Sequence, residues 1–221
     1  MDLAAKYKSV TEKINNACLQ SDRARGGVEL VAVSKTQTAE TISELLALGH
    51  RVFGENRIQE SQSKWPSLKE QYPDTELRLI GPLQSNKAAD AVTLFDVIET
   101  IDREKIAKAV ASEISKQGRD VASYVQVNTG MEDQKAGIAP DKAVEFVHFC
   151  QNDLALPVIG LMCIPPFEEN PGPHFALLRK LAREAGVTEL SMGMSGDFET
   201  AIGFGATSVR VGSAIFGARV Y

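Results

Sequence analysis

The sequence predicts one closed (β/α)8 barrel, or TIM barrel, with an additional N-terminal helix. Short runs rich in β-branched residues alternate with longer helical segments along the 221 residues. Several of these runs are continuously apolar, as in the strands of a parallel sheet that helices cover. Eight such repeats fit a (β/α)8 barrel at the small end of its size range. An open, doubly wound α/β sheet is the alternative, and it normally uses fewer strands.

Hydrophobic periodicity places the elements in chain order. An amphipathic opening from Leu3 to Leu19 predicts the N-terminal helix. The β-rich runs predict strands near 28–34, 51–53, 77–81, 96–99, 123–128, 158–163, 188–192 and 207–212. The segments between them predict helices over Thr38–Leu48, Arg57–Leu68, Arg103–Lys116, Asp141–Gln151 and Pro173–Ala185. No linker or low-complexity tract divides the chain, so we expect a single domain over residues 1–221.

Composition and charge exclude several classes of function. The net charge is −5 and the basic residues are scattered, which argues against a nucleic-acid partner. The sequence has no stretch of about 18 apolar residues, so no membrane span is expected. The N-terminus lacks the pattern of a secretory signal. The cysteines and histidines show no metal-binding spacing, and no disulfide framework is expected. We therefore expect a cytoplasmic protein without a metal site.

Lys35 is the first candidate functional residue. The apolar run before it places one primary amine at the carboxyl end of a strand, where barrel enzymes keep their chemistry. Apolar surroundings lower the pKa of a lysine and make its amine nucleophilic, as Schiff-base formation with an aldehyde or ketone requires. The alternative is a lysine that simply reaches solvent at a strand end.

Two glycine-containing turns are candidate anion sites. Met192–Phe198 and Arg210–Gly217 each leave a predicted strand and open a helix, and Ser195 and Ser213 offer hydroxyl groups there. Helix N-termini direct N–H groups at anions, and barrels often bind phosphate after strands seven and eight. Either turn by itself is also explained by a serine cap and a packing glycine, but their pairing favours phosphate.

Arg210 lies inside an apolar strand, where a buried guanidinium needs a partner. A bound anion or a heteroaromatic nitrogen would serve, and so would an internal Asp or Glu. A ligand with an aldehyde at one end and a phosphate at the other would satisfy both the amine and the anion turns. Pyridoxal 5'-phosphate fits that description, as does a sugar phosphate.

Six motifs in order closely resemble those of the pyridoxal phosphate homeostasis protein family. They run from about residue 28 to the C-terminus and are VAVSK (31–35), FGEN (53–56), IGPLQSNK (80–87), GLM (160–162), MGMSGD (192–197) and VRVGSAIFG (209–217). The resemblance implies a barrel similar to the N-terminal domain of alanine racemase.

The resemblance also implies roles for seven residues. Lys35 would hold pyridoxal 5'-phosphate as a Schiff base, and Arg210 would approach the pyridine nitrogen, where it weakens the ring as an electron sink. The phosphate would be held by Ser195, Gly212 and Ser213, and the pocket would be lined by Asn56 and Met194.

The function implied by the resemblance is binding, buffering or delivery of the cofactor by a monomer without a catalytic cycle, with apoenzymes as recipients. One departure is Pro82, where many members of the family have histidine. Lys87 and Lys135 are further amines near the predicted mouth, and either secondary cofactor contacts or solvated side chains would explain them.

Two enzyme classes remain as alternatives. A small racemase or decarboxylase would need a second acid/base opposite Lys35; no tyrosine falls in a predicted mouth loop, and Cys163 comes closest. A barrel aldolase would need a nearby proton-transfer group, for which Glu55 is the candidate.

Overall fold

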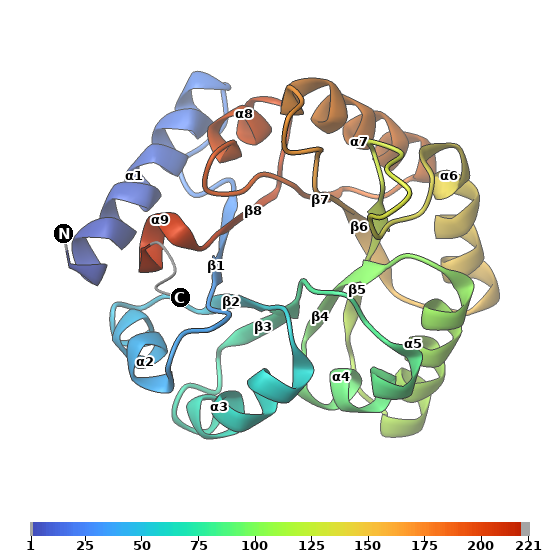
Figure 1. The fold of residues 1–221 in the computed structure, drawn as a ribbon, viewed down its shortest axis with the longest axis horizontal. Helices are drawn as coiled ribbons and strands as arrows, with labels where there is room; N and C mark the ends of the chain where they lie inside the picture. The colour runs from blue at the N-terminus through green and yellow to red at the C-terminus, as the bar shows by residue number, and fades with distance from the viewer. Residues whose placement is uncertain (1, 218–221) are drawn as a thin grey trace.

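Eight parallel strands close into a barrel, and helices surround it (Figure 1). The computed structural model describes residues 2–217. The strands are β1 (Glu29–Val33), β2 (Val52–Glu55), β3 (Glu76–Leu79), β4 (Val97–Ile101), β5 (Ala122–Val127), β6 (Val158–Cys163), β7 (Glu189–Ser191) and β8 (Ser208–Val211). Each strand pairs in parallel with the next, and β8 pairs with β1 to close the sheet. The predicted barrel is confirmed.

The helices lie outside the sheet. They are α1 (Leu3–Gln20), α2 (Ala39–Ala47), α3 (Ile58–Gln71), α4 (Ala88–Leu94), α5 (Glu104–Gln117), α6 (Pro140–His148), α7 (Pro171–Ala185), α8 (Phe198–Gly203) and α9 (Ser213–Phe216). The predicted N-terminal helix is α1, which begins at the cap Asp2 and packs against α8 and α9 beside the barrel (Figure 1). Within residues 2–217, no helix is both long and apolar enough to cross a membrane.

The apolar core fills the layer between the sheet and the helices. Trp65, Phe53, Phe95 and Phe175 are its largest fully buried side chains. The interior of the barrel is different, because it contains buried charged residues beside a small apolar group of Val97, Tyr124 and Met162. The mouth of the barrel therefore lies above a polar interior.

The helices differ from the sequence prediction where local chemistry overrides periodicity. α7 begins at Pro171, two residues early, because Asn170 caps it and proline is tolerated in a first turn. α6 ends at His148 and continues as a π-helical turn, Phe149–Asp153. The short α4 was not predicted, since seven residues carry little helical periodicity.

Candidate functional site

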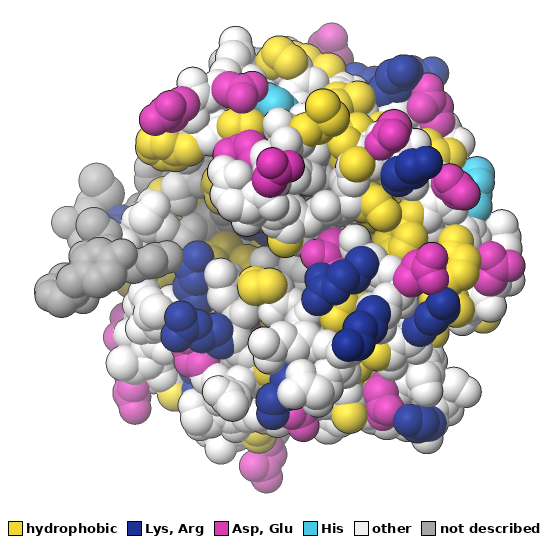
Figure 2. Space-filling model, turned by 45° about the vertical axis from the view of Figure 1, so that its right-hand side comes forward, with side chains coloured by type: hydrophobic (Ala, Val, Ile, Leu, Met, Phe, Trp, Pro, Cys, Tyr) yellow, Lys and Arg dark blue, Asp and Glu magenta, His cyan; other side chains and the backbone are white. Residues whose placement is uncertain are grey.

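The seven residues predicted for the site line one pocket at the carboxyl ends of the strands. Its volume is about 300 Å³, and Figure 2 shows a hollow on this face of the molecule, with Lys and Arg side chains beside it. The predicted residues in its lining are Lys35, Asn56, Met194, Ser195, Arg210, Gly212 and Ser213. Eight others complete it: Val33, Thr36, Gln37, Ile80, Ile164, Gly196, Phe216 and Gly217.

Lys35 occupies a tight turn directly after β1. The N–H of Gln37 donates to the carbonyl of Ser34 at 3.0 Å, which closes a four-residue turn around Lys35 and Thr36. Thr36 has φ +66°, a conformation that costs a β-branched residue free energy. Its N–H donates to Glu60 Oε1 at 2.6 Å. The turn is thus held in a strained conformation by a carboxylate from α3.

A buried lysine on α3 clamps the same turn from outside the barrel. Lys64 Nζ donates to the carbonyls of Ser34 at 3.1 Å and Gln37 at 3.3 Å. It also lies 2.9 Å from Glu60 Oε1 and 2.8 Å from Glu55 Oε1. We call Lys64, Glu55 and Glu60 the outer network. Because it fixes backbone on both sides of Lys35, it determines where that amine enters the pocket.

Glu55 does not serve the pocket: the sequence predicts it just after a strand near 51–53, but it is the last residue of β2. Its carboxylate is fully buried and accepts hydrogen bonds from Ser34 Oγ at 2.7 Å and Trp65 Nε1 at 3.0 Å. The side chain therefore faces α3 rather than the mouth. The aldolase alternative loses its candidate for proton transfer.

The two anion turns meet at Ser195. Its Oγ accepts from the N–H of Gly212 at 3.3 Å and of Ala214 at 3.4 Å, so the loop after β7 is bonded to the start of α9. Gly193 has φ +94°, and a Cβ there would lie 2.6 Å from the Cβ of Ala201. Glycine is required at this turn for both reasons. Ser195 does not cap α8, the helix after its own turn, whose cap residue is Asp197; it bonds the start of α9 instead, and it also lines the pocket.

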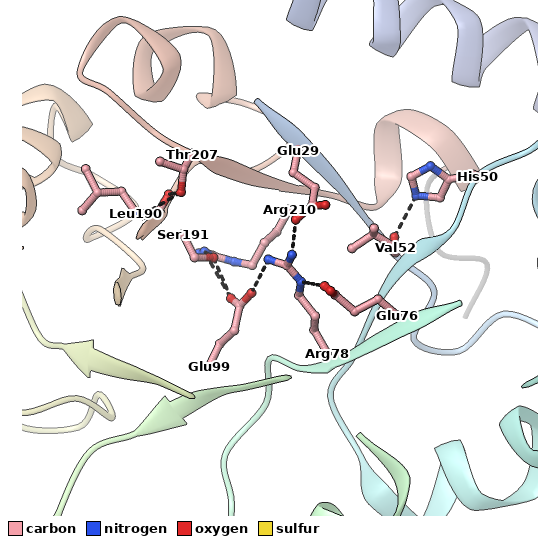
Figure 3. A network of polar contacts seen from close by, with 10 residues as sticks. All are labelled: Glu29, His50, Val52, Glu76, Arg78, Glu99, Leu190, Ser191, Thr207 and Arg210. Carbon is pink, nitrogen blue, oxygen red and sulfur yellow. Dashed lines mark hydrogen bonds and ion pairs between the residues drawn. The ribbon is translucent and has the colours of Figure 1, made fainter. Parts of the chain in front are cut away.

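Arg210 has partners inside the protein, including an acidic residue, which the sequence analysis gives as the alternative to a bound ligand. Its Nη1 donates to Ser191 Oγ at 2.6 Å, and its Nη2 donates to the carbonyl of Cys163 at 2.8 Å. Glu99 Oε2 lies 3.9 Å from Nη1 and accepts from Ser191 Oγ at 2.6 Å. Figure 3 shows that Glu99 links this group to Arg78 across the barrel. Arg210 still reaches the pocket lining.

Arg78 lies deeper in the barrel, among carboxylates. It pairs with Glu29, with Glu76 at 2.6 Å and with Glu99 at 3.3 Å. Burial by itself would lower the pKa of Arg78, but the surrounding carboxylates outweigh burial and raise it. We call Arg78, Glu99, Ser191 and Arg210, with the carboxylates of Glu29 and Glu76, the inner network.

The further lysines named from the sequence lie in neighbouring grooves. Lys87 pairs with Asp90 at 3.1 Å, and Lys135 pairs with Glu132 at 2.6 Å. Pro82 shares the groove of Lys87. Among residues 2–217, no group of three or more His, Cys, Asp or Glu side chains could hold a metal ion.

One atom of the pocket wall needs a polar ligand. Asn56 Oδ1 is buried and has no hydrogen-bond partner within the described part of the chain. A buried carbonyl oxygen without a donor is costly. The wall therefore fits a ligand that supplies a hydrogen-bond donor.

Fold and site together define a class: a (β/α)8 barrel with a lysine, a guanidinium and a serine–glycine anion cradle around one pocket at its mouth. The family described as alanine racemase, N-terminal domain, matches residues 13–220. The chain is 36% identical over 230 residues to the pyridoxal phosphate homeostasis protein of Aquifex aeolicus, covering 100% of both chains. It is 38% identical to the Vibrio cholerae protein of the same name, over 96% of this chain and 94% of that one.

A solved structure of PipY from Synechococcus elongatus with pyridoxal phosphate bound is also similar. It superposes with a TM-score of 0.80 at 34% identity, covering 94% of this chain and 100% of that one. The chain belongs to the pyridoxal phosphate homeostasis protein family, within the alanine racemase N-terminal domain class.

Proposed function

We propose that this protein binds pyridoxal 5'-phosphate and acts in the homeostasis of that cofactor, holding it as a Schiff base on Lys35. One observation carries the proposal: the amine, the anion turns and the buried guanidinium line the same pocket. The homeostasis proteins that match the full chain, and the PipY structure with pyridoxal phosphate bound, support it.

The pocket residues divide between the two ends of the ligand. When bound, the cofactor supplies a reactive aldehyde and a phosphate. The amine of Lys35 would add to the aldehyde carbon and form a C=N bond, and the aldehyde oxygen would leave as water. The phosphate would be held by Ser195, Gly212 and Ser213.

The side walls would orient the ring. Asn56 would accept a hydrogen bond from the ligand, since its buried Oδ1 has no partner within residues 2–217. Met194 would cover one side of the pocket, and Arg210 would lie by the ring nitrogen. A guanidinium is a donor only and stays protonated, so it disfavours protonation of that nitrogen.

We also propose that the protein does not run an amino-acid reaction. The sequence offers Cys163 as the closest second acid/base, but its thiol is buried and does not line the pocket. Burial raises the pKa of Cys163 to about 12, which keeps the thiol protonated near neutral pH. Of the tyrosines, Tyr7, Tyr72 and Tyr124 are not part of the lining; Tyr221 lies outside the described residues.

Three further proposals complete this function. We propose that the chain works as a monomeric, single-domain barrel over residues 1–221, that it acts in the cytoplasm, and that apoenzymes receive its cofactor. Light scattering of the purified protein with the cofactor bound tests the monomer, and a dimeric mass would contradict it.

The spectrum of the protein tests the main proposal. Purified protein should be yellow, and borohydride should bleach it and leave the cofactor attached to Lys35 in a peptide digest. Lys35→Ala should lose the band, whereas Lys87→Ala, a matched control outside the pocket, should keep it. A Lys35→Ala protein with the same band at full occupancy would show that another group holds the cofactor.

A further inference from the structure

The inner network reaches the pocket through Arg210, whose position is fixed by two residues that do not line the pocket. The Arg210 side chain is only 3% exposed. Its contacts with Ser191 Oγ and the Cys163 carbonyl hold the guanidinium from two neighbouring strands. Whatever places Ser191 therefore also places the charge at the pocket floor.

The direction of each hydrogen bond in this chain is determined by chemistry. A guanidinium only donates, so Ser191 Oγ accepts from Arg210. The one hydroxyl hydrogen of Ser191 is then left for Glu99 Oε2, 2.6 Å away. Arg210 and Glu99 are themselves 3.9 Å apart at their nearest atoms. The serine hydroxyl thus bridges the two charges.

Glu99 is shared between two guanidiniums. Its carboxylate is fully buried, and its other oxygen accepts from Arg78 Nη1 at 3.3 Å. The described residues that pair with Arg210 include no second carboxylate. The guanidinium at the pocket floor therefore keeps part of its positive field.

We propose that Glu99 and Ser191 are a relay that positions Arg210 beneath the bound cofactor. Through Arg210, the relay sets the proton affinity of the nitrogen whose protonation changes the visible absorbance band of the bound cofactor. This inference rests on the proposed function. A positive charge nearby disfavours a protonated nitrogen, and the negative charge of Glu99 moderates that effect. Ser191 holds the guanidinium away from a direct pair with Glu99 and close to the ligand.

The other charged and titratable groups around the relay come from every neighbouring part of the barrel. They are Glu29 of β1, Glu76 and Arg78 of β3, Tyr124 of β5, Cys163 of β6 and Glu189 of β7, with Lys35 and Asp197 at the mouth. Changes confined to Glu99 and Ser191 leave all of these groups in place, but loss of the Glu99 charge also removes a partner of Arg78. The Ser191 variant keeps both Arg78 and Glu99, so the opposite signs of the two shifts report on the relay.

Two variants should shift the titration in opposite directions. Glu99→Gln keeps an acceptor for Ser191 but removes one negative charge, so the field of Arg210 strengthens. The pH midpoint of the visible absorbance band of the protein loaded with pyridoxal phosphate should fall by about one pH unit. Ser191→Ala removes the bridge and lets Arg210 pair directly with Glu99. The midpoint should then rise by about half a unit.

Matched controls separate this role from a structural one. Ser208→Ala removes another buried hydroxyl, two residues before Arg210 on the same face of β8, whose Oγ has no hydrogen-bond partner among the described residues. It should leave the midpoint unchanged. Ser191→Thr retains a hydroxyl and should restore the wild-type midpoint.

The measurement is an absorbance titration of each protein with bound pyridoxal phosphate, from about pH 5 to about pH 10. Absence of a visible band in the wild type would refute the proposed function itself. If the band is present, shifts of the same sign in the two variants, or midpoints equal to that of Ser208→Ala, would refute the relay. A band that titrates in none of the proteins would refute it as well. If Glu99→Gln does not fold, Ser191→Ala and its threonine rescue decide the question.

Discussion

The outer and inner networks each hold a different group of one pocket, Lys35 and Arg210, and they are built from different cations. In the outer network, the ammonium of Lys64 contacts two backbone carbonyls and two carboxylates between β2 and α3. In the inner network, the guanidiniums of Arg78 and Arg210 share Glu99 across the barrel. An ammonium directs its donors to several segments, whereas a planar guanidinium fixes its donors in one plane.

This difference separates two functions. The outer network holds backbone, namely the strained turn that carries Lys35, so breaking it should cost stability and displace the amine. The inner network holds a side-chain charge, so breaking it should alter proton affinity in the pocket. Changes at Lys64, Glu60, Glu29 and Thr36 test this division, and a change at His50 isolates the acid response; they follow from the largest expected effect to the smallest.

Lys64→Met should be the most destabilising. It leaves Glu55 buried without its cation and removes the donors to the Lys35 turn, so the free energy of unfolding should fall by about 4 kcal/mol. Denaturant titration measures the loss. Lys69→Met is the matched control on the same helix, because Lys69 pairs with Asp96 in a more exposed position; its loss should be about 1 kcal/mol or less. Equal losses in the two variants would contradict the claim that the contacts of Lys64 in the outer network stabilise the fold more than an exposed ion pair does.

His50, which lies outside both networks, should make the protein less stable in acid. The imidazole is buried, its Nε2 donates to the carbonyl of Val52 at 2.7 Å, and burial lowers the pKa of His50 to about 4. Below about pH 6.5 the unfolded chain binds a proton that the folded protein does not. Stability should therefore fall as pH drops from about 6.5 towards 4, by about 3 kcal/mol in total.

The matching variant is His50→Gln, which retains an N–H donor for Val52. Its unfolding free energy should be lower than wild type at neutral pH but much flatter with acid, as measured by denaturant titration at several pH values. An equally steep loss in the variant would assign the acid response to other groups.

The sequence predicts much of the barrel and of the pocket lining because their signals are local. Apolar runs give the strands, and Lys35 and Ser195 stand directly after strands or in glycine turns. The networks gave no such signal. Lys64 is separated from Glu60 by one helical turn and looks like an ordinary surface pair, and Ser191 meets Glu99 across 92 positions of the chain. Such pairings arise only when the barrel closes.

The pKa values of two carboxyl groups, one in each network, are shifted in opposite directions. Burial raises the pKa of Glu60, but the hydrogen bonds from Lys64 and the N–H of Thr36 outweigh burial and lower it. Burial raises the pKa of Glu29 more than Arg78 lowers it. Glu60 therefore contributes stability above about pH 4.3 that is lost as pH falls through its folded pKa, whereas Glu29 costs stability above its folded pKa.

Two variants made in the His50→Gln background measure this contrast without the histidine response. Glu60→Gln should lose more stability at pH 7 than at pH 4, and Glu29→Gln should lose less at pH 7 than at pH 4. Each difference should stay below about 1 kcal/mol, because both carboxylates are partly exposed. Slopes of the same sign would remove this contrast between the networks.

The smallest expected effect is a gain in stability at the turn that the outer network holds. Thr36 has φ +66° and an exposed side chain, and its N–H bond to Glu60 does not depend on the side chain. Asparagine tolerates this conformation better than threonine. Thr36→Asn should therefore raise the unfolding free energy by about 0.5 kcal/mol. Thr188→Asn, at an exposed threonine without positive φ, should give no gain. Because Lys64 enforces the strained turn, the gain in stability from Thr36→Asn should vanish when Lys64→Met is also present. A gain that persists in the double variant would mean that the strain is local and independent of Lys64.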